Sequence, residues 1–221
     1  MNERVVVITG ATGALGKQAA RAFAQRGDRL ALLSRDAAAL ESLKEELNLP
    51  AGRILTRVLD IGNSGAVRAA AQAVAAELGG AHILLHLVGG WTGGKTLVEA
   101  SPDDLNLMLA QHVCTSFNLI QAFAPQLTGN GWGRALMVSS PVASRPAAKR
   151  GIYAAAKAAQ EALFLTLAQE VREAGVTANV ITVNSITANG TGTRPEEIVA
   201  AMLYLCSEEA GKVNGVRLPI A

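Results

Sequence analysis

Short apolar runs alternate with longer amphipathic, alanine-rich stretches along the whole chain. The short runs are rich in Val, Ile and Leu and are continuous, which is typical of parallel strands covered on both faces. They predict strands at 4–9, 29–34, 53–59, 81–88, 134–139, 176–183 and 216–220. The stretches between them predict helices at 37–47, 64–78, 102–127, 151–174 and 195–207, after a first helix that ends near residue 27. This alternation predicts one α/β domain over residues 1–221, a Rossmann-type doubly wound parallel sheet.

Composition supports a compact enzyme-like domain. The 221 residues, half of them hydrophobic, are enough to bury the core of one such domain. A net charge of +2 argues against nucleic acid or an anionic membrane surface as a partner. Cys114 and Cys206 fall in apolar helical patterns, so we expect neither a disulfide nor a zinc framework. Because no apolar run reaches the roughly 18 residues of a membrane helix, we expect a cytoplasmic protein. We also expect no metal site.

Three glycines follow the first predicted strand. Gly10, Gly13 and Gly16 lie between that strand and an alanine-rich helix. Glycines at this place allow a tight turn and close approach of the backbone to a pyrophosphate, while the helix N-terminus offers free N–H groups to the anion. The pattern therefore predicts dinucleotide binding.

The end of the second strand indicates which dinucleotide binds. An NAD-binding unit usually carries an acidic residue here, whereas this chain has Ser34 and Arg35. A hydroxyl and a guanidinium suit the 2′-phosphate of NADP, and Lys17 adds a second cation, so we favour NADP(H) over NAD(H). Asp36 either opposes this preference or caps the next helix.

Later strand ends offer further candidates. Asp60 either accepts a hydrogen bond from an adenine amino group or caps the helix that begins near Ser64. Trp91, in the glycine-rich loop after the fourth strand, either contacts substrate or nicotinamide or packs on the core. His82 and His86 lie about 13 Å apart on one strand, too far for one metal, and we interpret them as structural.

Tyr153 and Lys157 are the strongest candidates for catalysis. Residues four apart share a helix face, so the phenol and the ammonium point the same way. A cation beside a phenol lowers its pKa from about 10 and brings the group toward working pH. Ser140 follows the fifth strand and precedes this helix.

Together these motifs resemble the short-chain dehydrogenase/reductase family over essentially the whole chain. The resemblance implies that Tyr153 is the general acid/base, that Lys157 binds the nicotinamide ribose and lowers the tyrosine pKa, and that Ser140 hydrogen-bonds the substrate oxygen. A carbonyl that receives a hydride needs these functions. The motifs that carry the resemblance are the Gly10, Gly13 and Gly16 turn, Asp60, the Gly89-Gly90 strand end, Ser140, Tyr153 with Lys157, Arg194-Pro195-Glu196-Glu197 and Tyr204-Leu205-Cys206-Ser207. We expect cofactor contacts from Gly10, Thr12, Gly13, Leu15, Gly16, Lys17, Ser34, Arg35, Asp60, Gly89, Gly90, Tyr153, Lys157 and Ile186.

The chain departs from the family pattern in three places. Ala14 stands where the commonest glycine turn has glycine, and His112 replaces the usual active-site asparagine. The usual proton path from the lysine is therefore open to question, and an imidazole is a candidate substitute. The segment that normally folds over substrate is cut to about ten residues after Val183-Asn184. We expect an open pocket or one completed by a neighbouring subunit.

These observations predict an NADP(H)-dependent oxidoreductase that exchanges hydride between nicotinamide and a carbonyl or alcohol carbon. The loop around Trp91 also resembles that of dihydropteridine reductases, so a pterin reductase is the first alternative. A non-catalytic NADP(H) sensor or scaffold is an alternative of another class. Apolar residues over much of the circumference of the helices at 102–127 and 151–174, and the resemblance itself, predict a homodimer or homotetramer.

Overall fold

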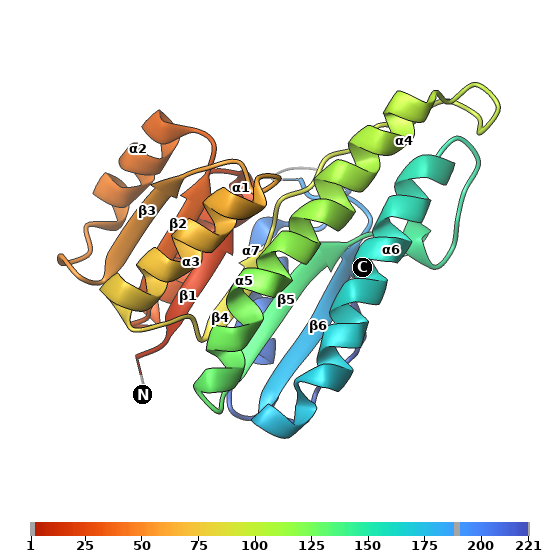
Figure 1. The fold of residues 1–221 in the computed structure, drawn as a ribbon. Coiled ribbons are helices and arrows are strands. Elements are labelled where there is room, and N and C mark those ends of the chain that lie inside the picture. Colours follow the sequence, from red (N-terminus) through yellow and green to blue (C-terminus); the bar gives the residue numbers. More distant parts are fainter. Residues whose placement is uncertain (1–2, 188–190, 221) are drawn as a thin grey trace.

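A parallel sheet forms the centre of the protein. The computed structural model describes residues 3–187 and 191–220. Within them the sheet has seven strands in the order β3-β2-β1-β4-β5-β6-β7, all parallel (Figure 1). The strands are β1 Val5–Thr9, β2 Arg29–Ser34, β3 Ile54–Val58, β4 Ile83–His86, β5 Gly133–Ser139, β6 Val176–Val183 and β7 Arg217–Ile220. The order reverses between β1 and β4, where ligands bind in sheets of this kind.

Helices cover both faces of the sheet. One apolar core joins the sheet to α3, α5 and α6, and the other joins it to α1, α2 and α7. The helices are α1 Ala14–Gln25, α2 Ala37–Leu47, α3 Ser64–Leu78, α4 Pro102–Leu109, α5 Thr115–Gly129, α6 Gly151–Glu170 and α7 Pro195–Leu205. All five residues of β1 are fully buried, as its continuous Val/Ile run predicts. The predicted fold class is confirmed.

Two predicted helices differ from the structure. The helix expected over 102–127 is interrupted by a π-helix, η1 Ala110–Cys114, between α4 and α5. The hydroxyl of Thr115 donates to the Gln111 carbonyl at 2.7 Å, and such side-chain bonds satisfy carbonyls that the wider turn leaves free. The helix expected over 151–174 ends at Glu170 and is followed by a 3-10 turn, Arg172–Ala174, because Gly175 takes a left-handed conformation.

Side chains cap several helices. The Asp36 carboxylate accepts a hydrogen bond from Ala39 N at 2.9 Å at the start of α2, so the capping interpretation of Asp36 holds. Asn63 caps α3 through Ala66 N, and Ser101 forms a capping box with Asp104 at the start of α4. Asp60 is therefore not the cap of α3.

No helix within residues 3–187 and 191–220 has both the length and the apolar character needed to cross a membrane. The same residues contain no group of three or more His, Cys, Asp or Glu side chains placed to hold a metal ion.

Candidate functional site

A groove runs along the carboxyl ends of the strands and contains two adjoining cavities. The first has a volume of about 380 Å³ and lies over β1, β2 and β3. The second has a volume of about 350 Å³ and lies beside the start of α6. Leu87, Val88 and Gly89, which follow β4, line both cavities and join them. The groove therefore spans the point where the strand order reverses.

The glycine turn forms one wall of the first cavity. Gly10 has φ +68°, and a Cβ atom there would lie 3.2 Å from the carbonyl carbon of Leu87. A Cβ atom on Gly16 would overlap the Gly10 carbonyl oxygen, so α1 packs against this turn only because residue 16 is glycine. Gly13 precedes α1 as its N-cap. The turn thus presents backbone and the start of a helix to the cavity.

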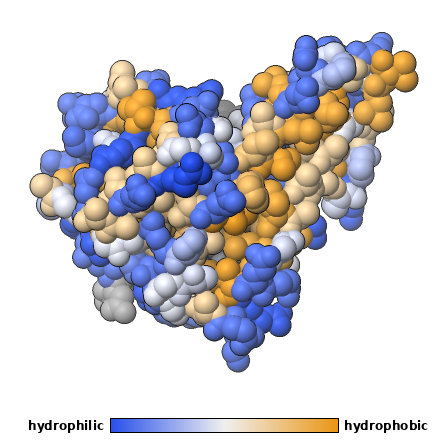
Figure 2. All heavy atoms as spheres, viewed as in Figure 1, coloured by the Kyte–Doolittle hydropathy of each residue, from blue (hydrophilic) through white to orange (hydrophobic). Residues whose placement is uncertain are grey.

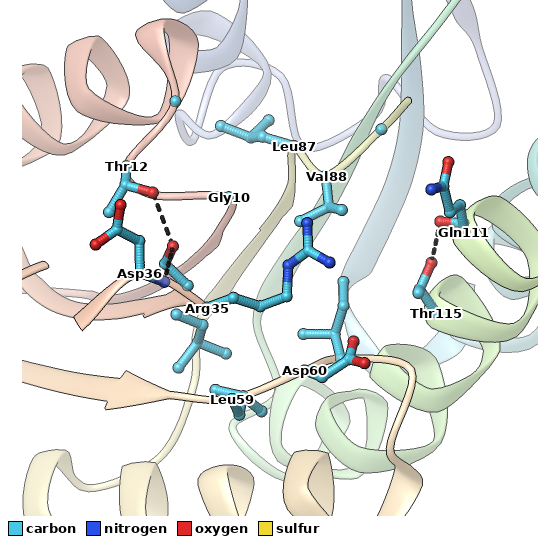
Figure 3. A pocket seen from close by; sticks show the side chains of 15 residues that line it. Gly10, Thr12, Arg35, Asp36, Leu59, Asp60, Leu87, Val88, Gln111 and Thr115 are labelled. Atoms are coloured by element: carbon cyan, nitrogen blue, oxygen red, sulfur yellow. Dashed lines mark hydrogen bonds between the residues drawn. The ribbon is translucent and has the colours of Figure 1, made fainter. Parts of the chain in front are cut away.

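Polar side chains from β2 and the glycine turn meet in the first cavity. The hydroxyls of Thr12 and Ser34 lie 2.7 Å apart, and Arg35 extends into the cavity (Figure 3). Among the described residues, Arg35 has no carboxylate partner within 4.0 Å. Lys17 does not line this cavity, and its predicted contact with the cofactor stays a prediction.

Asp60 also lines the first cavity, below Arg35 in Figure 3. One of its carboxylate oxygens accepts a hydrogen bond from Gly62 N at 2.9 Å, which closes the turn before α3. The position at the cavity suits the predicted adenine contact, which stays a prediction.

The second cavity brings together most of the residues predicted for catalysis. Tyr153 and Lys157 come from α6, and Ser140, 7% exposed, follows β5. The side chains of residues after β4 and β6 complete the lining. The predicted residues of this cavity are Leu15, Gly89, Gly90, Trp91, His112, Ser140, Tyr153, Lys157 and Ile186.

Lys157 is held firmly beneath the cavity. Its ammonium donates to the Val138 carbonyl and to Gln160 Oε1, both at 2.8 Å. Burial lowers the pKa of Lys157 to about 8, and the nearby Glu161 carboxylate opposes that shift. Two of the three ammonium donors are used, so one remains for a ligand.

Tyr153 does not show the lowered pKa that the sequence predicts. Burial raises the pKa of the Tyr153 phenol, and the cation that opposes this is Arg150, not Lys157. The physical reason is that the Lys157 ammonium is directed into the protein, toward β5 and Gln160. In this structure the phenol therefore keeps its proton at neutral pH.

His112 lies in the π-helix and is fully buried. Its Nε2 donates to the Gly90 carbonyl at 2.9 Å, and its ring meets the Tyr153 ring edge-on at a centroid distance of 5.6 Å. Burial, followed by the charge of Lys157, lowers the pKa of His112 to about 4. A neutral imidazole bound to a carbonyl anchors the Gly90 loop and is poorly suited to act as the proton donor.

The other two histidines have structural partners. His86 is buried, and its Nδ1 lies 3.0 Å from the Thr9 hydroxyl. His82 Nδ1 accepts a hydrogen bond from Val5 N at 3.3 Å. These contacts support their interpretation as structural residues.

Sequence reasoning missed the polar residues behind the cavities. Gln160 contacts Lys157, and Ser116 contacts Gln160 at 2.8 Å. A signal was available for Gln160, because it is a polar residue on the same face of α6 as Lys157, three positions later. Gln111 and Thr115 line the first cavity and carried no such signal.

Comparisons with known proteins agree with this geometry. The model of the short chain dehydrogenase family matches residues 4–198. The chain is 31% identical to dehydrogenase/reductase SDR family member 7B of Bos taurus over 84% of this chain and 62% of that protein. It is 27% identical to D-threitol dehydrogenase of Mycolicibacterium smegmatis over 100% of this chain and 92% of that protein.

The fold is similar to that of L-sorbose reductase from Gluconobacter frateurii, whose structure was solved in complex with NADPH and L-sorbose. The two structures have a TM-score of 0.87 and 25% sequence identity, over 100% of this chain and 95% of the other. The family match extends over most of the chain and includes the glycine turn, Ser140, Tyr153 and Lys157. This chain therefore belongs to the short chain dehydrogenase family, whose members are oxidoreductases that act on alcohol and carbonyl groups.

Proposed function

We propose that the protein is an NADP(H)-dependent oxidoreductase that transfers hydride between the nicotinamide and the carbon of a carbonyl or alcohol. The observation that carries this proposal is the single groove with Arg35 at one end and Tyr153, Lys157 and Ser140 at the other. Its two cavities meet at Gly89, so an extended dinucleotide fits along the groove with one end in each.

The residues of the first cavity suit the phosphorylated half of NADP(H). The Gly10 and Gly13 turn would let the backbone approach the pyrophosphate closely. A side chain at residue 10 would press on Leu87 and Val88, which line the same cavity. Arg35 and the hydroxyl pair of Thr12 and Ser34 would bind the 2′-phosphate. The L-sorbose reductase structure contains NADPH and supports this choice. When bound, the nicotinamide supplies or accepts the hydride.

The second cavity would supply the proton. The raised pKa keeps the Tyr153 phenol protonated, which suits proton donation to the oxygen of a carbonyl that is being reduced. Ser140 lies in the same cavity and would donate a hydrogen bond to that oxygen. The free donor of Lys157 would bind the nicotinamide ribose and hold the ring beside Tyr153.

A substrate panel tests this function. We expect at least one ketone or aldehyde to oxidise NADPH in the presence of the protein, with loss of NADPH absorbance that requires both protein and carbonyl. A chain that binds NADPH but turns over no member of a broad panel would favour the sensor or scaffold instead.

Trp91 supports pterin reduction as a second candidate. Its side chain is 58% exposed and lines the second cavity, where its flat face is available to stack on a bicyclic ring. A quinonoid pterin in the same panel separates the two functions, because pterin reduction predicts that it is consumed faster than simple ketones.

We also propose that the protein is a homodimer or homotetramer. Apolar residues gather over the face formed by α4, α5 and α6 (Figure 2). Phe117 is 48% exposed on α5, and Leu105 and Leu107 are exposed on α4. Pairing of such faces would remove this apolar surface from water. Light scattering at micromolar concentration should give the mass of two or four chains, and a monomer would contradict the proposal.

A further inference from the structure

A chain of buried hydrogen bonds lies directly beneath the second cavity. Lys157 donates to Gln160 Oε1 at 2.8 Å, Gln160 Nε2 donates to Ser116 Oγ at 2.8 Å, and Ser116 donates to the His112 carbonyl at 2.6 Å. These four residues are at most 4% exposed. These hydrogen bonds connect α6 to the backbone of the π-helix through the side chains of Gln160 and Ser116.

The amide is chemically suited to its place. Its oxygen accepts from the ammonium while its nitrogen donates to a hydroxyl, so one side chain satisfies two buried polar groups of different kind. A buried donor or acceptor left without a partner costs about 1–3 kcal/mol. An apolar side chain of the same size at residue 160 would leave both Lys157 and Ser116 short of a partner.

We propose that Gln160 is a positioning residue that fixes the Lys157 ammonium under the cavity and ties it to the π-helix through Ser116. This inference rests on the proposed function, in which Lys157 holds the nicotinamide ribose.

The charge of Lys157 depends on the groups that surround it. On α6, Glu161 favours the ammonium, but its carboxylate also pairs with Arg217 of β7. His86 of β4 and His112 of the π-helix have pKa values of about 3 and about 4, so both are neutral near pH 7. Tyr153, one turn earlier on α6, is also neutral there. Among the described residues, Gln160 is thus the only side chain that forms a hydrogen bond with the Lys157 ammonium. The other partner is the backbone carbonyl of Val138.

Two substitutions of opposite chemistry test this role. Gln160→Met keeps the length but removes the acceptor, so the pKa of Lys157 should fall further below its native value. Gln160→Glu places a carboxylate beside the ammonium, so that pKa should rise. Both variants lose the amide donor to Ser116. A carboxylate beside the ammonium raises the pKa of Lys157 whatever the role of the amide, so Gln160→Met is the decisive variant. A purely space-filling role would leave the pKa of Lys157 unchanged in Gln160→Met.

The measurement is the NMR titration of lysine labelled at Cε in the protein without cofactor. The chain has six lysines, and Lys157→Met identifies the resonance of Lys157. Gln169→Met, an exposed glutamine on α6, is the matched control and should leave the titration unchanged. Ser116→Ala keeps the test decisive if Gln160→Met does not fold, because it frees the amide to rotate and should lower the pKa of Lys157 to a smaller extent.

A lower pKa of Lys157 in Gln160→Met supports the positioning role, and an unchanged or higher pKa in that variant overturns it. NADPH binding is a second readout: between pH 7 and pH 9, Gln160→Met should lose roughly tenfold more affinity than the native protein, the effect of losing one charge-assisted bond. If the titration behaves as expected but no NADPH binds, the proposed function fails and the positioning role of Gln160 stands.

Discussion

The two ends of the groove are built differently. At the Arg35 end, the surfaces offered to a ligand are a backbone turn, a helix start and partly exposed side chains from adjoining segments. At the Tyr153 end, Ser140, His112 and Lys157 are buried. The surrounding contacts join residues far apart in sequence, such as Gln160 with Ser116 and His112 with Gly90. We propose that the first end binds an anion and that the second controls the charges of Lys157 and Tyr153.

This difference predicts two kinds of mutational effect. Substitutions at the Arg35 end should change which cofactor binds and leave the chemical step intact. Substitutions at the Tyr153 end should change the rate and its pH dependence more than the choice of cofactor. The predictions below test this separation from the largest expected effect to the smallest.

Removal of the phenolic hydroxyl should have the largest effect. Tyr153→Phe should lower kcat by roughly 10²- to 10⁴-fold, the usual contribution of a general acid, with NADPH affinity nearly unchanged. Steady-state rates with a substrate from the panel and NADPH titration by tryptophan fluorescence measure the two quantities. Turnover at the native rate would show that another group donates the proton.

The charge of Lys157 should make NADPH binding depend on pH. Its pKa of about 8 lies below the ordinary lysine value of about 10.4, so the ammonium is present at pH 7 and is lost as pH rises through about 8. NADPH affinity should then fall by about tenfold or more, the size of one charge-assisted bond. Titrations from pH 6 to pH 10 test this. Lys157→Met should bind NADPH weakly at every pH. If Lys157→Met instead keeps the native dependence of NADPH affinity on pH, the ammonium of Lys157 is not the group that titrates.

Reversal of the charge at Arg35 should change cofactor choice. We expect the native protein to bind NADPH at least tenfold more tightly than NADH, because charge-assisted bonds to a 2′-phosphate contribute about 1.5–3 kcal/mol each. Arg35→Asp should reverse that preference without changing kcat. Arg172→Asp is the charge-matched control, since Arg172 is exposed beside the amino end of β6. Equal dissociation constants for the two cofactors in the native protein would refute the preference.

Trp91 should have the smallest effect. If a flat ring stacks on it, Trp91→Ala should raise the KM for a ring-containing substrate by about three- to tenfold, in line with the 0.5–1.5 kcal/mol of an aromatic pair. NADPH affinity should stay the same. An equal increase in KM for small aliphatic ketones would show that Trp91 shapes the cavity without stacking.

The same contrast explains what the sequence predicts well. The glycine turn, the strand ends and the Asp36 and Ser101 caps depend on neighbouring residues, so local patterns identify them. The π-helix and the bond from Gln160 to Ser116 depend on how α6 packs against α5, across 44 positions, and no local pattern encodes that packing.

The expectation that the pKa of Tyr153 is lowered failed for a related reason. Spacing along a helix places Tyr153 and Lys157 on one face, but it does not say that Val138 and Gln160 direct the ammonium inward. The pKa of Tyr153 is consequently raised by burial.

A crystal structure of the protein with NADPH tests most directly whether the two ends form one site. We predict that the 2′-phosphate contacts Arg35 and Ser34 and that the nicotinamide lies in the cavity lined by Tyr153 and Lys157. A nicotinamide outside that cavity, or a 2′-phosphate that makes no contact with Arg35, would contradict the proposal that this groove binds the cofactor and carries out the chemistry.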